Sequence, residues 1–504
     1  MMEVIWKEGP KDPTCGLEKK LDMLLQSLPN SPYWKFFLAL NAVPRASKKE
    51  EAIRQHIIVF AQERALDWEE DAVGNILIRK PASQGWEDRP VIALQGHLDM
   101  VHQKNADVPF DFDKQGIEMF VDGEWLRAKG TTLGADNGLG VAAILAILDD
   151  AELSHPALEA LFTIDEETGM TGAKGLQPGW LKAKYLLNLD TEEEDEITIG
   201  CAGGIDTLID HHLEVVSSQD GHKAMKISVK GLFGGHSGTD IHTGRANANK
   251  LLFRLLNQLQ NQLAFSLAEV DGGGLRNAIP REASAIITLA PADLEALMGL
   301  VANWESTFQQ EYAATDPNLI VKLSEVSMPQ MVLEAIGQRR LILAVESCFN
   351  GIFRMSPEVD DLVETSSNLA RIVLKDGVLN VQSLQRSSRE SAKMDVSEVV
   401  AAPFEMLGAM VRREGSYPGW TPDPHSHLVA HIAQLHREVF QREPKVLACH
   451  AGLECGLIGK AMPMAEMISF GPTIRNAHSP DECAHIPAAE RVWQFLLKVL
   501  ETLK

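Results

Sequence analysis

The sequence lacks any apolar stretch that could cross a membrane. Its longest uninterrupted apolar run covers residues 141–148 and is closed by Asp149 and Asp150, whereas a spanning helix requires about 20 such residues. The first residues, MMEVIWKEGPKDP, mix charges with prolines and contain no apolar segment of signal-peptide length. We therefore expect a soluble intracellular protein that has no membrane partner.

Cysteine is also scarce. The chain has 6 cysteines among 504 residues, and none of them forms a C-x-x-C pair. Cysteines this few and this irregularly spaced do not suit a disulfide scaffold, whereas they suit the reducing environment of the cytosol. The sequence therefore predicts a cytoplasmic location.

Basic residues are outnumbered by acidic ones. The chain has 47 Lys and Arg against 70 Asp and Glu, which gives a formal net charge of −23, and no block of five or six consecutive basic residues interrupts this excess. A surface this acidic repels phosphate backbones and anionic lipids. We therefore expect no nucleic-acid partner and no binding to a membrane surface.

The remaining composition is that of a soluble globular protein with several domains, because 45% of its residues are apolar and 23% are charged. Short apolar runs at residues 91–97, 160–164 and 185–189 alternate with helical segments such as 138–150. Strands that are apolar on both faces and separated by helices are typical of a mostly parallel sheet covered by helices. These segments therefore predict an α/β domain.

The pattern changes near Gly200 and changes back near Met406. Between these positions, the alternating segments 223–231 and 283–290 accompany a long helical segment at 246–263, which is typical of an α+β unit. We therefore predict an α/β domain that an inserted α+β domain interrupts. The predicted segments are 1–203 and 407–504 for the α/β domain, 204–406 for the inserted domain, and an irregular or helical extension over 1–30.

Five residues that commonly bind metals occur where the α/β pattern places the ends of strands and the loops that follow them. They are His97, Asp136, Glu167, Asp190 and His478. Functional groups at the carboxyl ends of strands in an open α/β sheet converge even when they are distant in sequence. Two imidazoles and three carboxylates suit a pair of zinc ions with one bridging carboxylate, which is a common hydrolytic arrangement.

Each of these motifs also has a simpler explanation when it is taken alone. A histidine after an apolar strand is often a hydrogen-bonded structural residue, Asp136 could cap a helix, and Glu166 with Glu167 could be a solvated acidic pair. Their combination favours the metal site. Asp99 follows His97 by two residues and could fix the tautomer of its imidazole, while Glu166 offers a second carboxylate that could act as a base.

The sequence resembles a known family. The stretches GNILIRKPA, HLDMV, GTTLGADNG, CAGGID, GGHSG, GGGLRNAIPREA, HAGLECGL, GPTI and HSPDE are similar to those of the aminoacyl-histidine dipeptidases, also called peptidase D or Xaa-His dipeptidases. These enzymes belong to the two-zinc exopeptidase superfamily, which also includes carnosinases and aminoacylases. The resemblance extends from about residue 40 to the C-terminus and implies a catalytic domain with an inserted lid domain.

The resemblance also implies how the metal ligands are shared. Asp136 would bridge two Zn²⁺ ions in each subunit. His97 and Asp190 would complete the site of one ion, and Glu167 and His478 would complete the site of the other. Co²⁺ or Mn²⁺ can occupy sites of this kind in place of zinc.

Catalytic and substrate-binding roles follow from the same resemblance. Asp99 would orient the neighbouring histidine ligand, and Glu166 would be the general base that deprotonates a metal-bridging water and then protonates the leaving amine. In the lid domain, His236 would donate to the scissile carbonyl oxygen, while Asn277 and Arg386 would hold the substrate. A structural role in a loop or in a surface ion pair stays open for the three lid residues.

The implied activity is the metal-dependent hydrolysis of a small peptide, preferably an Xaa-His dipeptide such as a carnosine-like substrate. One alternative is an N-acyl amino acid deacylase, or a broader di- or tripeptidase, with the same two metals. Another is a metal-dependent binding protein without turnover, which the presence of a carboxylate at Glu166 disfavours. Both a monomer and a homodimer are compatible with the sequence.

Overall fold

A computed structural model describes residues 22–504, and the chain divides into two compact units. The first unit comprises the residues up to Ile199 together with Asp423–Leu447 and Leu457–Lys504, and the inserted unit comprises Gly200–Pro422 and Ala448–Gly456. The predicted extension over 1–30 lies largely outside the described residues. Its remainder is helical at 22–27.

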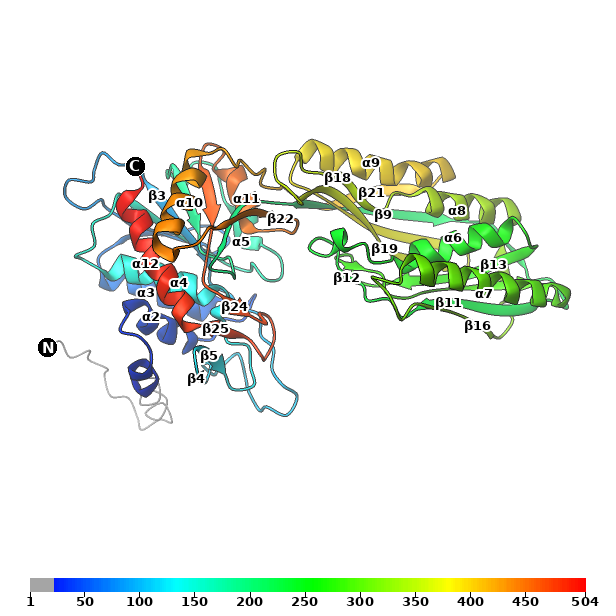
Figure 1. Cartoon of the computed structure of the whole chain (residues 1–504), viewed down its shortest axis with the longest axis horizontal. Helices are drawn as coiled ribbons and strands as arrows, with labels where there is room; N and C mark the ends of the chain where they lie inside the picture. Colours follow the sequence, from blue (N-terminus) through cyan, green and yellow to red (C-terminus); the bar gives the residue numbers. More distant parts are fainter. Residues whose placement is uncertain (1–21) are drawn as a thin grey trace. The chain divides into compact units, whose positions relative to one another are not determined.

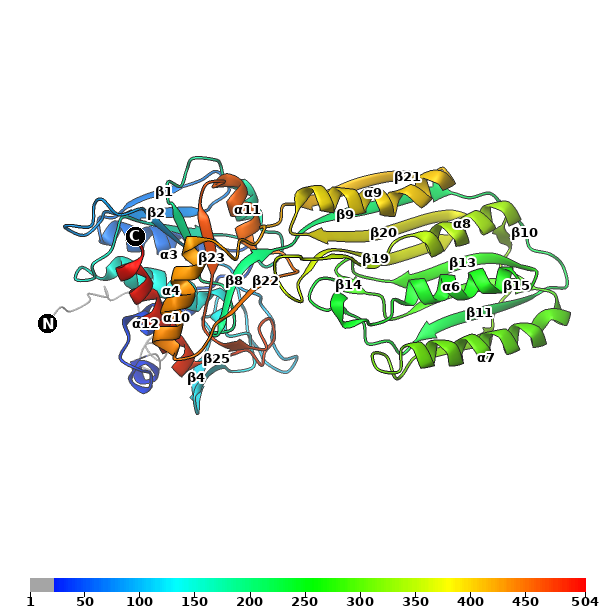
Figure 2. The same ribbon diagram turned by 45° about the horizontal axis from the view of Figure 1, so that its top comes forward.

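The first unit is built on an eight-stranded mixed sheet whose central strands are parallel (Figures 1 and 2). Strands β6, β3, β7 and β23 run parallel to one another, whereas β2 pairs antiparallel with β6 at one side. This arrangement confirms the predicted α/β class. In sheet order, the strands are β1 (Asp67–Glu70), β2 (Ile76–Lys80), β6 (Leu158–Thr163), β3 (Ile92–His97), β7 (Tyr185–Asn188), β23 (Glu466–Ser469), β8 (Glu196–Cys201) and β22 (Lys445–Cys449).

Helices pack around this sheet, and a small antiparallel sheet completes the unit. The helices are α2 (Pro32–Asn41), α3 (Glu51–Glu63), α4 (Ala135–Asp149), α5 (Thr171–Gly175), α10 (His427–Phe440), α11 (Glu454–Ala461) and α12 (Ile486–Thr502). The small sheet has the order β24 (Ile474–Arg475), β25 (Cys483–His485), β5 (Trp125–Ala128) and β4 (Met119–Asp122). One hydrophobic core joins the sheet to the helices.

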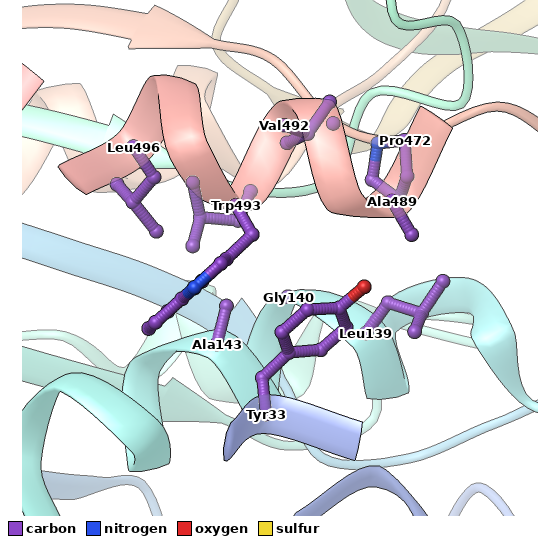
Figure 3. Close-up of a pocket in the computed structure, with 11 residues that line it drawn as sticks. Tyr33, Leu139, Gly140, Ala143, Pro472, Ala489, Val492, Trp493 and Leu496 are labelled. Carbon is purple, nitrogen blue, oxygen red and sulfur yellow. The ribbon is translucent and has the colours of Figure 1, made fainter. Parts of the chain in front are cut away.

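Helix α4 lies at the centre of this core. Its residues from Leu139 to Leu148 are all buried, because an apolar helix without a polar face must be covered on every side. Helices α2 and α12 border a small pocket beside α4 (Figure 3). The side chains that line this pocket are apolar apart from the Tyr33 hydroxyl and the ring nitrogen of Trp493. No helix among residues 22–504 is both long enough and apolar enough for a membrane span.

The inserted unit is an antiparallel sheet of nine strands with four helices on one face (Figures 1 and 2). In order, the strands are β16 (Ile320–Glu325), β11 (Lys223–Lys230), β15 (Ala283–Leu289), β13 (Phe265–Gly273), β19 (Val363–Lys375), β20 (Val378–Ser387), β9 (Gly203–His212) and β21 (Met410–Tyr417), with β18 (Gly351–Met355) paired to β19. The helices are α6 (Ala248–Gln260), α7 (Leu294–Glu311), α8 (Ala335–Ser347) and α9 (Glu390–Leu407). They share a second core with the sheet, as expected for an α+β unit.

Short elements complete the inserted unit. They are the paired strands β10 (Val215–Ser217) and β17 (Met331–Leu333), the paired strands β12 (Gly235–His236) and β14 (Ala278–Ile279), and the 3₁₀ turns η1 (Ile241–Thr243) and η2 (Pro291–Asp293). The β12–β14 pair contains one of the predicted lid residues, His236.

The limits of the inserted unit differ from the predicted limits of 204 and 406. After α9, Gly408 adopts a left-handed conformation and the chain returns as β21, which pairs with β9 from Met410 to Tyr417. Residues 448–456 also belong to this unit, and the Ala202 N–H donates to the carbonyls of Cys449 and Ala451. Strand β21 is polar and half exposed, so its sequence carries no strong strand signal.

We expect Phe37→Ala to destabilise the first unit. The Phe37 ring is fully buried, and a Cβ at Gly138 of α4 would lie 3.0 Å from its Cε2 atom, so truncation would leave a cavity between α2 and α4. Urea unfolding should show a loss of about 3–5 kcal/mol. The exposed control Val59→Ala should change the free energy of unfolding by less than about 0.5 kcal/mol, and equal losses in the two variants would contradict this packing.

Candidate metal centre

The five predicted metal ligands come together at the carboxyl-end edge of the parallel strands. His97 is the last residue of β3, Glu167 follows β6, and Asp190 follows β7. Asp136 lies in the first turn of α4, and His478 lies in the loop between β24 and β25. All five belong to the first unit.

On one side of this group, the buried His97 imidazole faces two carboxylates. Its Nε2 atom lies 3.0 Å from Oδ1 of Asp136 and 3.4 Å from Oδ1 of Asp190. Its Nδ1 atom lies 3.1 Å from the Asp99 carbonyl oxygen and 3.4 Å from Oδ1 of the same residue. Because Asp99 engages Nδ1, the ring is held with Nε2 directed toward the other carboxylates.

On the other side, His478 makes the matching contacts. Its Nε2 atom lies 3.1 Å from Oδ2 of Asp136 and 3.0 Å from Oε2 of Glu167. The side chain of His478 is 51% exposed, whereas that of His97 is 1% exposed. Asp136 therefore presents one carboxylate oxygen to each imidazole, as a bridging ligand would.

Two observations show that these residues fit a metal centre. Ligand atoms of His97, Asp136 and Glu167 all lie within 4.8 Å of one another. In addition, the buried Oε1 of Glu167 accepts no hydrogen bond from residues 22–504, and the buried Oδ1 of Asp190 has only the 3.4 Å contact with Nε2 of His97, a costly arrangement that a cation would relieve. Imidazole nitrogens and carboxylate oxygens suit zinc, cobalt and manganese alike.

The protonation of the group leads to the same conclusion. Burial lowers the pKa of the His97 imidazole, but Asp190 and Asp136 outweigh this effect and raise that pKa well above its usual value. Hydrogen bonds to Asp136 and Glu167 raise the pKa of His478 to about 11. Burial and the neighbouring Asp136 raise the pKa of Asp190 to about 6. This concentration of buried carboxylates therefore favours positive charge, which protons or metal ions can supply.

Asp99 also fixes the loop that carries the predicted base. Its Oδ1 atom accepts the Glu166 N–H at 3.0 Å, and its Oδ2 atom accepts the Glu167 N–H at 3.3 Å. Asp99 is completely buried. Burial raises the pKa of this carboxyl, but the contact with His97 more than offsets that effect and keeps it below its usual value. A single ionised side chain therefore ties the loop after β6 to the end of β3.

The predicted lid residues lie in the inserted unit, where two of them are adjacent. The Arg386 guanidinium is buried and donates to Tyr417 Oη at 3.0 Å and to Ser237 Oγ at 3.3 Å, and its Nη2 atom lies 3.4 Å from Nε2 of His236. Within residues 22–504, no carboxylate forms an ion pair with this guanidinium. Asn277 is exposed, and its carbonyl accepts the Ser237 N–H.

The His236 imidazole has a defined tautomer. Its Nδ1 atom accepts the backbone N–H groups of Gly238 at 3.2 Å and Thr239 at 3.1 Å. These two contacts are shorter than the 3.4 Å contact of Arg386 Nη2 with Nε2, so we assign the ring proton of the neutral form to Nε2. Burial and the adjacent Arg386 lower the pKa of His236. The side chain is therefore a neutral donor, and a donor of this kind can stabilise an oxygen that becomes negatively charged.

Several polar residues near these groups, three of them buried and Tyr417 partly exposed, were not predicted from the sequence. In the first unit they are Arg45 and Glu482, and in the inserted unit they are Tyr417 and His450. Glu482 and His450 occur in the stretches HSPDE and HAGLECGL, so the motifs contained them, but nothing in the motifs assigned them a role. Arg45 and Tyr417 lie in none of the quoted motifs, and their contacts join distant parts of the chain, so the sequence gives no sign of them.

We expect His450 to make the protein sensitive to acid. Its Nε2 atom lies 2.8 Å from Ser366 Oγ, and burial together with Arg386, His236 and His242 lowers its pKa to about 3. In the unfolded chain this imidazole is protonated as the pH falls below about 6.5, whereas in the folded chain it is protonated only near pH 3. Stability should therefore decrease across this window, with a slope of up to about 1.4 kcal/mol per pH unit from this group.

Denaturant unfolding at a series of pH values measures that slope. The variant His450→Gln should lose stability less steeply than the parent protein between pH 6 and pH 5. Carboxylates that titrate in this range, such as Asp190 with its pKa of about 6, are common to both proteins and cancel in the comparison. Identical slopes in the two proteins would show that His450 is protonated in the folded state.

The chain is similar to known peptidases over most of its length. Residues 93–502 match peptidase family M20/M25/M40. The chain is 42% identical over 479 residues to the cytosol non-specific dipeptidase of Escherichia coli (strain K12), which covers 95% of this chain and 99% of that protein. The crystal structure of aminoacylhistidine dipeptidase from Vibrio alginolyticus matches with a TM-score of 0.90 and 41% identity, over 95% of this chain and 98% of that one.

A more distant structure shows how widely this fold is shared. A tripeptidase from Staphylococcus aureus matches with a TM-score of 0.53 and 15% identity, over 94% of this chain and 98% of that one. At this identity, the likeness concerns the fold alone.

Proposed function

The chain belongs to peptidase family M20/M25/M40, and from this premise we propose that it is a metal-dependent dipeptidase. This membership agrees with the resemblance of the sequence motifs. The observation that carries the proposal is the carboxylate of Asp136, which lies 3.0 Å from one imidazole and 3.1 Å from another. A carboxylate shared by two histidines can bridge a pair of hydrolytic metal ions.

The proposed centre holds two Zn²⁺ ions, for which Co²⁺ or Mn²⁺ could substitute. His97 and Asp190 would bind one ion, Glu167 and His478 the other, and Asp136 both. Two buried carboxylate oxygens support this assignment: Oε1 of Glu167 has no hydrogen-bond donor in the described part of the chain, and Oδ1 of Asp190 has only the 3.4 Å contact with His97. When bound, such ions polarise a carbonyl group and make a water molecule easier to deprotonate.

Glu166 is the proposed general base. It takes a proton from the attacking water, whose oxygen forms a bond to the carbonyl carbon of the substrate. The bond from that carbon to the amide nitrogen then breaks, and Glu166 returns the proton to the departing amine. Asp99 supports this role because it holds the backbone of Glu166 and also orients His97.

The inserted unit supplies the proposed substrate-binding groups. Nε2–H of His236 would donate to the carbonyl oxygen as it becomes negative. Arg386 would bind the terminal carboxylate of the dipeptide, because its buried charge lacks a carboxylate partner among the described residues. Asn277 is exposed beside Ser237 and is proposed as a further substrate contact.

The proposed substrate is an unblocked dipeptide, with Xaa-His preferred. The two relatives with more than 40% identity support a dipeptide, since one is named a non-specific dipeptidase and the other an aminoacylhistidine dipeptidase. The name of the Escherichia coli relative also supports a cytoplasmic location. The assembly, monomer or homodimer, stays a prediction.

We expect Glu166→Gln to reduce turnover by about 10²–10⁴-fold, the usual contribution of a general base. Its metal content should stay at the parent value, because Glu166 is not among the proposed ligands. The neighbouring variant Glu167→Gln is a matched control, and it should lose bound metal. Kinetic assays and elemental analysis of both proteins test the assignment. Turnover of Glu166→Gln at the parent rate would refute it.

Hydrolysis of a substrate panel tests the proposed function as a whole. The panel contains Xaa-His dipeptides, dipeptides without histidine, tripeptides and N-acetyl amino acids. We expect dipeptides to be cleaved fastest, activity to disappear after chelation, and Zn²⁺ to restore it. Faster cleavage of N-acetyl amino acids or tripeptides would favour the alternative specificity. Undiminished activity in a metal-free protein would overturn the mechanism.

A further inference from the structure

Arg45 joins two of the loops that carry proposed metal ligands. Its buried guanidinium donates from Nη1 to the carbonyls of Leu98 and Asp99, each at 3.2 Å, and from Nη2 to the carbonyl of Gly134 and to Oδ1 of Asn41. The first two carbonyls follow directly after the end of β3, and the third lies just before α4. One side chain therefore ties together two segments that are distant in sequence.

Glu482 joins the segment at the start of α4 to the loop that carries His478. Its carboxylate is 2% exposed and accepts four successive backbone N–H groups, those of residues 133–136. Oε2 accepts the first two at 2.7 and 2.9 Å, and Oε1 accepts the next two at 2.8 and 3.4 Å. Glu482 follows His478 by only four residues, so it anchors that loop to the first turn of α4.

The two side chains meet at Gly134. Its N–H donates to Glu482 while its carbonyl accepts from Arg45. Gly134 has φ of +70°, and a Cβ there would lie 2.5 Å from Nη2 of Arg45 and 2.8 Å from Sδ of Met100. A side chain at this position would be strained and would displace the guanidinium. The backbone before Asp136 is therefore held from both sides.

We propose that Arg45 and Glu482 are positioning residues that hold the loops of His97, Asp136 and His478 at the separations metal binding requires. This inference rests on the proposed metal centre. Neither side chain contacts an imidazole nitrogen or a carboxylate oxygen of the proposed ligands; both act through the backbone. Groups that orient metal ligands in this way commonly affect metal affinity about 10–100-fold.

Electrostatics favours the same role for Arg45. Its positive charge acts on Glu482, Asp99, Asp136 and Glu167, although burial lowers its own pKa to about 10. The charge offsets part of the repulsion among these carboxylates. This effect favours the close approach of the loops that carry them.

The first test is Glu482→Gln, which replaces one carboxylate oxygen by an NH₂ group and leaves backbone N–H groups without an acceptor. We expect the dissociation constant for Zn²⁺, measured by competition with a chromogenic chelator, to rise about 10–100-fold. Activity should fall at limiting Zn²⁺ and recover at excess Zn²⁺, whereas KM at saturating metal should stay at the parent value.

Glu159→Gln is the matched control. Glu159 is also a buried carboxylate of the first unit, and it accepts the backbone N–H groups of Lys182 and Ala183, a loop that carries no proposed ligand. This variant should lose thermal stability in the same way but keep the parent Zn²⁺ affinity. Equal Zn²⁺ affinities for Glu482→Gln and Glu159→Gln, both measured on folded protein, would overturn the inference.

Arg45→Lys provides a second, independent test and decides the matter if Glu482→Gln does not fold. Lysine keeps the charge but cannot donate to two loops in a fixed geometry, so Zn²⁺ affinity should again fall about 10-fold or more. An unchanged Zn²⁺ affinity in this variant would overturn the inference for Arg45. Failure of the parent protein to bind Zn²⁺ would instead overturn the proposed function, which separates the two outcomes.

Discussion

The carboxylate of Asp136, placed between two imidazoles, is the constraint on which the rest of the first unit depends. Its two oxygens lie about equally far from His97 and His478, although His478 is 342 residues away in sequence. The end of β3, the first turn of α4 and the loop between β24 and β25 must therefore meet within a few ångströms. The buried α4, the Glu482 carboxylate and the Arg45 guanidinium all serve this convergence.

The buried functional groups of the two units carry opposite charges. In the first unit, carboxylates raise the pKa values of both histidines, and Oε1 of Glu167 is buried without a hydrogen-bond donor from residues 22–504, so the group favours cations. In the inserted unit, the buried Arg386 has only neutral partners among the described residues, so it favours an anion. A dipeptidase needs both features, because metal ions activate the scissile bond while a cationic group can bind the terminal carboxylate of the substrate.

Much of this organisation could be predicted from the sequence. Parallel strands are short apolar runs, so the polar residues that follow β3, β6 and β7 were visible as candidate ligands, and the change in pattern near Gly200 indicated an inserted unit. Strand β21 was missed because it is a half-exposed polar edge strand. Arg45 and Glu482 were missed for a different reason. Their partners are backbone carbonyl and N–H groups, which every residue possesses and no motif can reveal.

The sequence by itself determined which residues are candidate ligands, their order along the chain and the α/β and α+β character of the two units, since these follow from residue identity, local composition and periodicity. Only the tertiary structure decided that Asp136 faces both histidines, that the Nε2 atom of His236 carries the proton, and that Arg386 has no carboxylate partner among the described residues. These properties depend on distances between segments far apart in the chain, and such distances are fixed by packing rather than by any local pattern.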